Sequence, residues 1–167
     1  MSLAETVISA VRGKREPQGV VHVVDHSPLN WLYITYNTVE ELVRTDENGH
    51  IVPAAMQSYK WIDDLTLEVK LRPNKFQNGE PLTARNVKQS FDEMQHRRSP
   101  HPPGTQFNLS PETRMEVVDD ETVRYLFPKP DGMVLGKMRA MHIMNPQFWD
   151  TIGFGFTRQD KTGEGHW

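Results

Sequence analysis

Two stretches of the chain alternate apolar and polar residues with a period of two. The first covers residues 65–71, and the second covers residues 115–127. In both, an Asp-Asp pair lies at the predicted turn, at residues 63–64 and 119–120. A period of two is typical of a strand with one buried face. The chain therefore predicts two β-hairpins in an antiparallel sheet.

Between the two predicted hairpins the period changes to that of a helix. Thr83 is placed to be the N-cap, and Leu82 before it can pack on Val87 as a hydrophobic staple. Apolar residues then recur at spacings of three and four on one face: Ala84, Val87, Phe91 and Met94. We expect this helix to lie across the sheet, with the following core residues packed against it: Leu65, Leu67, Val69 and Leu71.

Weaker patterns predict the remaining elements. Helical spacing or capping residues favour helices over residues 4–12, 30–44 and 131–140, and from Asn145-Pro146 onward. β-Branched residues favour a short strand from Val20 to Val24, and turn residues predict loops over 46–49 and 97–111. With the sheet and its helix, these elements predict an α+β fold.

Length and composition narrow the function classes. A chain of 167 residues is long enough for one domain, and 37% apolar with 25% charged residues is typical of a globular protein. A net charge of -3 gives no basic surface for nucleic acid, so no nucleic-acid partner is expected. The absence of cysteine excludes disulfides and thiolate chemistry.

Candidate catalytic and metal-binding residues do not form a recognisable motif. The two Asp pairs lack a neighbouring acid, base or metal ligand, and the seven histidines lack metal-site spacing. Ser90 lies within the predicted helix with no base nearby. We therefore expect no enzyme activity, no catalytic metal and no cofactor.

Four of the eight methionines lie between Met133 and Met144. Methionine adapts to irregular surfaces, so the segment is either ordinary core or a surface that packs against another partner. In the second case, apolar surface here and at Phe148-Trp149 would favour self-association.

Residues 75–91 carry a family resemblance. Their sequence, Lys-Phe-Gln-Asn-Gly-Glu-Pro-Leu-Thr-Ala-Arg-Asn-Val-Lys-Gln-Ser-Phe, closely resembles the signature of the peptide/nickel class (family 5) of ABC-transporter extracytoplasmic solute-binding proteins. Gln77 and Asn78 replace the usual His-Asp, and Asn86 replaces an acidic residue. The flanking hairpins resemble the family in the same order, and residues 163–167 resemble a degraded copy of its Gly-Thr-Gly-Pro-Tyr motif.

The resemblance implies a periplasmic-binding-protein type II-like fold, in which two lobes close on a ligand. It implies that residues 1–18 are an N-terminal extension, partly vector-derived or flexible. Residues 19–167 would be the N-terminal lobe with its insertion subdomain, and the second lobe has no counterpart in this sequence. We therefore expect the chain alone to bind no peptide tightly, because one wall cannot enclose a ligand.

The implied function is capture of a peptide or similar small solute in the periplasm or another extracytoplasmic space, and its delivery to ABC permease subunits. No signal peptide opens this sequence, so we expect it to have been removed. Candidate ligand-binding residues are Asp25, His26, Tyr33, Pro103 and Trp167. Three alternatives remain: a ligand-sensing domain of a transcriptional regulator with the same fold, a non-transport interaction module, and an enzyme.

Overall fold

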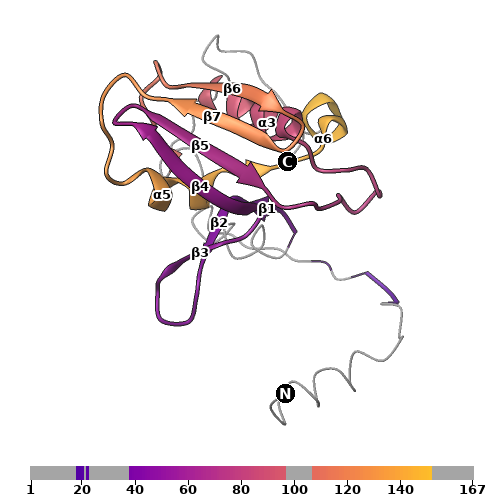
Figure 1. Cartoon of the computed structure of the whole chain (residues 1–167). Helices are drawn as coiled ribbons and strands as arrows, with labels where there is room; N and C mark the ends of the chain where they lie inside the picture. The colour runs from indigo at the N-terminus through magenta and orange to yellow at the C-terminus, as the bar shows by residue number, and fades with distance from the viewer. Residues whose placement is uncertain (1–17, 21, 23–37, 97–106, 152–167) are drawn as a thin grey trace.

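A four-stranded antiparallel sheet forms the centre of the molecule. The computed structural model describes residues 18–20, 22, 38–96 and 107–151. The sheet order is β4-β5-β7-β6. The strands are β4 (Met56–Asp63), β5 (Thr66–Leu71), β6 (Arg114–Asp119) and β7 (Thr122–Leu126). Figure 1 shows that helix α3 lies behind this sheet, on one of its faces.

Both predicted hairpins are present, and they join into one sheet. β4 pairs with β5 and β6 pairs with β7, as the alternating pattern predicts, and β5 pairs with β7 to connect the hairpins. Leu67, Val69 and Leu71 are fully buried on the face that bears the helix. The prediction for Leu65 is wrong: it lies in the turn before β5 and is 39% exposed. A residue outside the strand no longer follows the alternation of the sheet faces.

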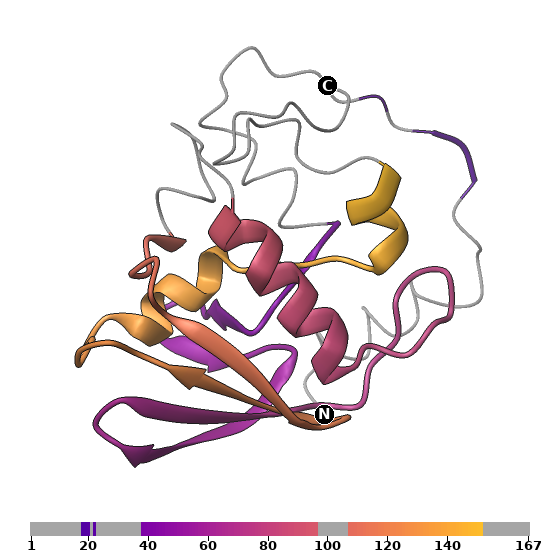
Figure 2. The ribbon, with the colours of Figure 1, turned by 90° about the horizontal axis from the view of Figure 1, so that it is seen from above.

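Helix α3 (Ala84–His96) begins where the capping residues predict. The carbonyl of Thr83 accepts the first helical hydrogen bond from the amide of Val87, at 3.2 Å. Leu82 and Val87 are both buried in the core cluster, as the predicted staple requires. The predicted helix face is buried as well, through Ala84, Val87, Phe91 and Met94. Figure 2 shows α3 crossing over the sheet.

Two small sheets replace the helix predicted over residues 30–44, whose first part lies outside the described residues. β1 (Glu40–Glu41) pairs with β8 (His142–Ile143), and β2 (Val43–Thr45) pairs with β3 (Ile51–Pro53). The helix prediction is therefore wrong from residue 38 onward. The backbone carbonyls of residues 41 and 42 accept hydrogen bonds from residues 54–56 instead, and these long-range bonds override the helical spacing.

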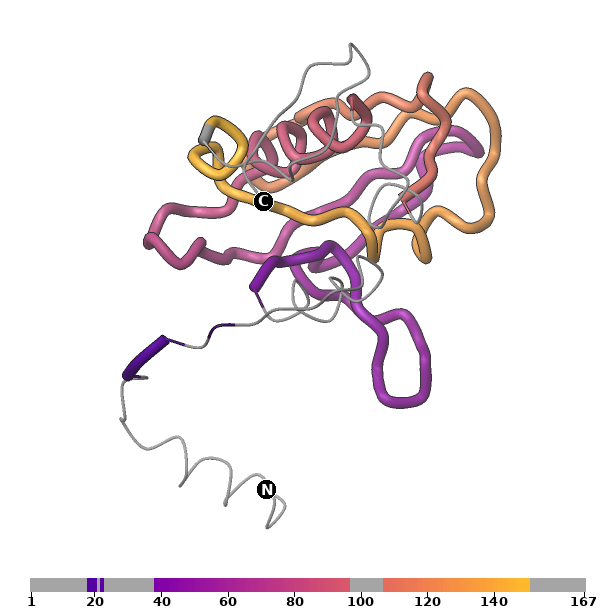
Figure 3. The backbone as a smooth tube through the Cα atoms, turned by 180° about the vertical axis from the view of Figure 1, so that it is seen from behind, coloured from indigo at the N-terminus to yellow at the C-terminus, as the bar shows by residue number. Residues whose placement is uncertain are grey.

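The β2–β3 hairpin projects from the body of the molecule, as Figures 1 and 3 show from opposite sides. Its turn lies over residues 46–49, as predicted. One oxygen of Asp46 accepts hydrogen bonds from the amides of Asn48 and His50, at 2.9 and 2.8 Å. The bond from the His50 amide is the main cause that lowers the pKa of Asp46. The ionised Asp46 therefore stabilises this turn.

The C-terminal segment is less regular than predicted. Residues 131–140 form a short helix α5 (Val134–Lys137) and one 3-10 turn η1 (Met138–Ala140) rather than a continuous helix. Helix α6 (Pro146–Thr151) begins as predicted. The side-chain oxygen of Asn145 accepts a hydrogen bond from the amide of Phe148, at 2.9 Å, which satisfies one free donor of the helix start.

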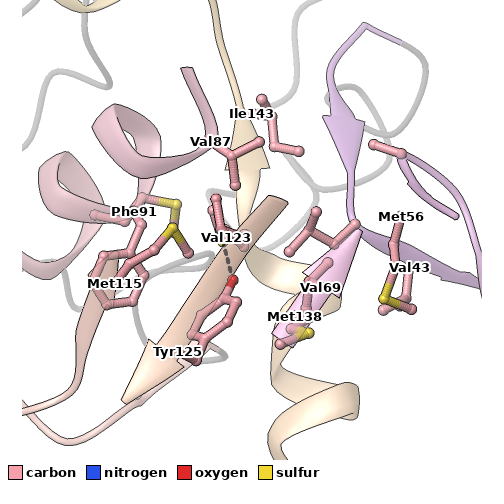
Figure 4. Packing of buried hydrophobic residues seen from close by; sticks show 14 of the residues in the cluster. Val43, Met56, Val69, Val87, Phe91, Met115, Val123, Tyr125, Met138 and Ile143 are labelled. Carbon is pink, nitrogen blue, oxygen red and sulfur yellow. Dashed lines mark hydrogen bonds between the residues drawn. The ribbon is translucent and has the colours of Figure 1, made fainter. Parts of the chain in front are cut away.

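The methionine-rich segment is mainly core. Met138 and Met141 are fully buried, and Trp149 is also buried, whereas Met133 is 68% exposed. Figure 4 shows Met138 beside Val69 of the sheet. The hydroxyl of Tyr125 lies 2.8 Å from the sulfur of Met141, and burial raises the pKa of this tyrosine. Of the two alternatives left open by the sequence, the core therefore holds for Met138, Met141 and Trp149.

The other face of the sheet carries charges of alternating sign. The side chain of Glu68 lies between Lys60 and Arg124, with shortest distances of 2.8 and 2.7 Å. These partners hold the pKa of Glu68 below its usual range, the Lys60 hydrogen bond being the larger cause. In the register of β6 and β7, Glu116 lies opposite Arg124 and continues the alternation. This row is a solvated face of the sheet.

The remaining predicted elements lie mostly outside the described residues. The helix predicted over residues 4–12 and residues 97–106 of the long loop lie outside them. Of the strand predicted from Val20 to Val24, only Val20 and His22 are described. Neither Val20 nor His22 belongs to a regular element.

Candidate functional site

The family signature builds a tight turn that leads into α3. Lys75 and Pro81 form an isolated β-bridge, and the amide of Phe76 bonds the carbonyl of Glu80 at 2.9 Å. Gly79 has a φ of 89°, a left-handed conformation that favours glycine. The signature therefore shapes the backbone around the start of the helix.

The three residues that differ from the family signature, Gln77, Asn78 and Asn86, make hydrogen bonds that hold the local structure. The side-chain oxygen of Asn86 accepts hydrogen bonds from both the amide and the hydroxyl of Thr83, each at 2.8 Å. This is the part that Glu or Gln plays in a capping box. The side-chain amide of Gln77 donates to the carbonyl of Thr38 at 3.1 Å and joins the signature turn to the chain before β1. Asn78 accepts from the amide of Glu80 at 3.1 Å.

The Asp pairs form turns, as their spacing predicts. Asp63 accepts a hydrogen bond from the amide of Leu65, and Asp119 accepts one from the amide of Glu121, each at 2.8 Å. The bond from Glu121 is the main cause that lowers the pKa of Asp119. Both carboxylates are therefore engaged by their own turns.

Ser90 joins three segments inside the core. Its fully buried hydroxyl oxygen accepts hydrogen bonds from the amide of Met144 and the indole of Trp149, each at 3.1 Å. The hydroxyl in turn lies 3.4 Å from the Met144 carbonyl. This geometry holds α6 and the strand before it against α3, and it is a structural arrangement.

One ionisable pair is fully buried. Glu41 of β1 and His142 of β8 are register partners, and His142 Nε2 lies 3.5 Å from Glu41 Oε1. Their side chains are 2% and 0% exposed. Both side chains are away from solvent, so this contact belongs to the interior of the protein and not to an open site. The sequence pattern missed it, since the two residues lie about a hundred positions apart.

The described residues contain neither a metal-binding cluster nor a membrane-spanning helix. No group of three or more His, Asp or Glu side chains there could hold a metal ion. No helix in the same part of the chain is long and apolar enough to cross a membrane. The candidate ligand-binding residues all lie outside the described residues: Asp25, His26, Tyr33, Pro103 and Trp167.

The described residues do contain a cavity of about 490 Å³ at one end of the sheet. Three segments line it: residues 108–113 before β6, residues 127–131 after β7, and Lys137 of α5. The sequence pattern does not predict this cavity, because its three lining segments meet only after the hairpins have paired.

Comparison with known proteins finds a family model that matches more than half of the chain. Residues 50–165 match the model of the family described as bacterial extracellular solute-binding proteins, family 5 middle. The match covers both hairpins, the signature turn and α3. Family 5 comprises solute-binding proteins of transport systems.

Individual relatives are solute-binding proteins as well. The chain is 40% identical over 60 residues to the nickel-binding protein NikA of Staphylococcus aureus, which is 35% of this chain and 12% of that protein. It is 28% identical to NikA of Brucella suis, solved with Fe(III)-EDTA, over 69% of this chain and 24% of that one, with a TM-score of 0.58. DppA of Helicobacter pylori, solved with the peptide STSA, is 20% identical to this chain. The alignment covers 77% of this chain and 28% of that one, also with a TM-score of 0.58. The solved relatives have the periplasmic-binding-protein type II fold.

Proposed function

This chain belongs to the bacterial extracellular solute-binding proteins of family 5, and from that premise we propose that it serves an ABC importer as part of its solute receptor. The receptor captures a peptide, a nickel complex or a similar small solute outside the cytoplasm and delivers it to the permease. The observation that carries this proposal is the family match over residues 50–165.

The extent of the match supports the proposal that this chain corresponds to one part of a larger receptor. The chain spans about a quarter of the two solved relatives above, 24% and 28% of their lengths. We assign residues 19–167 to the N-terminal lobe with its insertion subdomain, as the signature implies. In this assignment, α3 and the sheet are scaffold, and the second lobe supplies most of the ligand contacts. The candidates within this chain are Asp25, His26, Tyr33, Pro103 and Trp167.

Uptake measurements in the source bacterium test the transport function. We expect deletion of the encoding gene to reduce uptake of a labelled di- to pentapeptide pool or of nickel supplied with histidine. The reintroduced gene should restore it, and uptake of a free amino acid serves as the control. Unchanged uptake of both the peptides and the nickel would contradict the proposal.

Calorimetry tests the lobe assignment separately. We expect the 167-residue chain to show no saturable micromolar binding to the same peptide pool, because a single lobe leaves one side of the ligand in water. Saturable micromolar binding would show that the chain is sufficient as a receptor. That result would overturn the lobe assignment and leave the transport function standing.

A further inference from the structure

The cavity at the end of the sheet has a positively charged rim. Lys137 Nζ lies 2.6 Å from Asp131 Oδ2, and both side chains are partly exposed. Lys129 lies on the same rim. Two ammonium groups and one carboxylate leave a net charge of about one positive unit at this rim.

The carboxylate of Asp131 is already occupied. One of its oxygens accepts from Lys137, and the other accepts from the amide of Met133 at 2.9 Å. Burial raises the pKa of Asp131, but these hydrogen bonds and the charges of Lys137 and Lys129 outweigh it and leave the pKa below its ordinary value. An ammonium group has three N–H donors, and Asp131 uses one of those on Lys137. The rim therefore retains donors for a second anion.

The inner wall of the cavity is apolar and fixed in place. Phe127 and Leu109 are both buried, and Pro128 and Pro130 line the same space without offering amide donors. The ring of Phe127 stacks on Tyr125, with centroids 5.9 Å apart and planes 6° apart. These side chains make the inner side of the cavity apolar, whereas the exposed lining as a whole is more polar than apolar.

Thr113 also belongs to the lining, although its hydroxyl oxygen is itself buried. Thr113 is 4% exposed, and its Oγ1 has no hydrogen-bond partner among the described residues. A volume of about 490 Å³ lies in the range of small-molecule sites.

We propose that this cavity binds a small carboxylate with an apolar body, such as an aromatic or branched-chain acid. The carboxylate lies between Lys129 and Lys137, and the apolar body lies against Phe127. This site is separate from the solute capture proposed above and does not depend on it.

Benzoate and its neutral analogue benzamide test the site. Titration of the isotope-labelled 167-residue chain is followed in its nitrogen–proton correlation spectrum. We expect saturable shifts for benzoate at the amides of Phe127, Lys129 and Asp131, and binding of benzamide at least about threefold weaker. Equal binding of the two compounds, or no saturable shift at these amides, overturns the proposal.

Three variants locate the charge effect. Lys129→Gln and Lys137→Gln should each weaken benzoate binding at least about threefold. Lys88→Gln is the matched control, because Lys88 forms a similar 2.6 Å ion pair with Asp92 on α3, away from this cavity. Lys129 is exposed, so its variant remains informative even if Lys137→Gln disturbs α5. Binding unchanged in Lys129→Gln, or weakened equally in Lys88→Gln, contradicts the proposed site.

Discussion

Replacement of Ser90 by alanine should destabilise the chain more than any loss of side-chain volume explains. The hydroxyl of Ser90 accepts hydrogen bonds from the Met144 amide and the Trp149 indole, each at 3.1 Å, in a fully buried position. Leaving a buried donor without its acceptor costs about 1–3 kcal/mol. With two donors and partial relaxation, we expect Ser90→Ala to lower the free energy of unfolding by about 3 kcal/mol.

Urea unfolding followed by tryptophan fluorescence measures this loss. With an m-value of about 2 kcal/mol/M, the midpoint should fall by about 1.5 M while the m-value stays the same. Arg85→Ala, at an exposed position of the same helix, is the control, and it should change stability by less than about 0.5 kcal/mol.

A double-mutant cycle separates the hydrogen bond from the general effect of the substitution. Because Trp149→Phe removes one of the two donors, Ser90→Ala should cost at least about 0.5 kcal/mol less in that background. If Ser90→Ala changes stability by less than about 0.5 kcal/mol, or if the two substitutions are simply additive, the role assigned to this hydroxyl is wrong.

Three further predictions concern the sheet and its turns. In urea unfolding, Leu67→Ala should cost about 2–5 kcal/mol, whereas Leu65→Ala should cost less than about 1 kcal/mol, because only the first side chain is buried; similar costs would contradict the assigned strand boundary. The pKa of Asp46 is lowered in the folded chain, so its stabilisation is present above the ordinary value of 3.8 and disappears as the pH falls below it. Acid titration of Asp46→Asn by circular dichroism should therefore show a smaller loss of stability below that pH than the parent chain. Gly79→Ala should cost about 1 kcal/mol through its positive φ, while Gly132→Ala, which has open space and no such φ, should not; thermal unfolding that ranks them in the opposite order would contradict this.

The sequence alone was enough to predict the central layer. The alternation in residues 65–71 and 115–127, the turns at the Asp pairs and the helix start at Thr83 all act over a few residues. The structure confirms these elements, with the exception of Leu65, which lies in the turn before β5. The resemblance of residues 75–91 indicated the family, and the family match over residues 50–165 confirms it.

Tertiary structure decided the features that join distant segments. The apolar spacing before residue 44 indicated a helix. Hydrogen bonds from residues 54–56 instead hold Glu41 in strand β1 and Leu42 in the bend that follows it. The methionines could have been surface or core, and packing against the sheet buries Met138 and Met141. Glu41 with His142, and the lysines around the cavity, come together only after the hairpins pair. Local patterns carry no information about such contacts, because the energy that forms them is gained only when the chain has closed on itself.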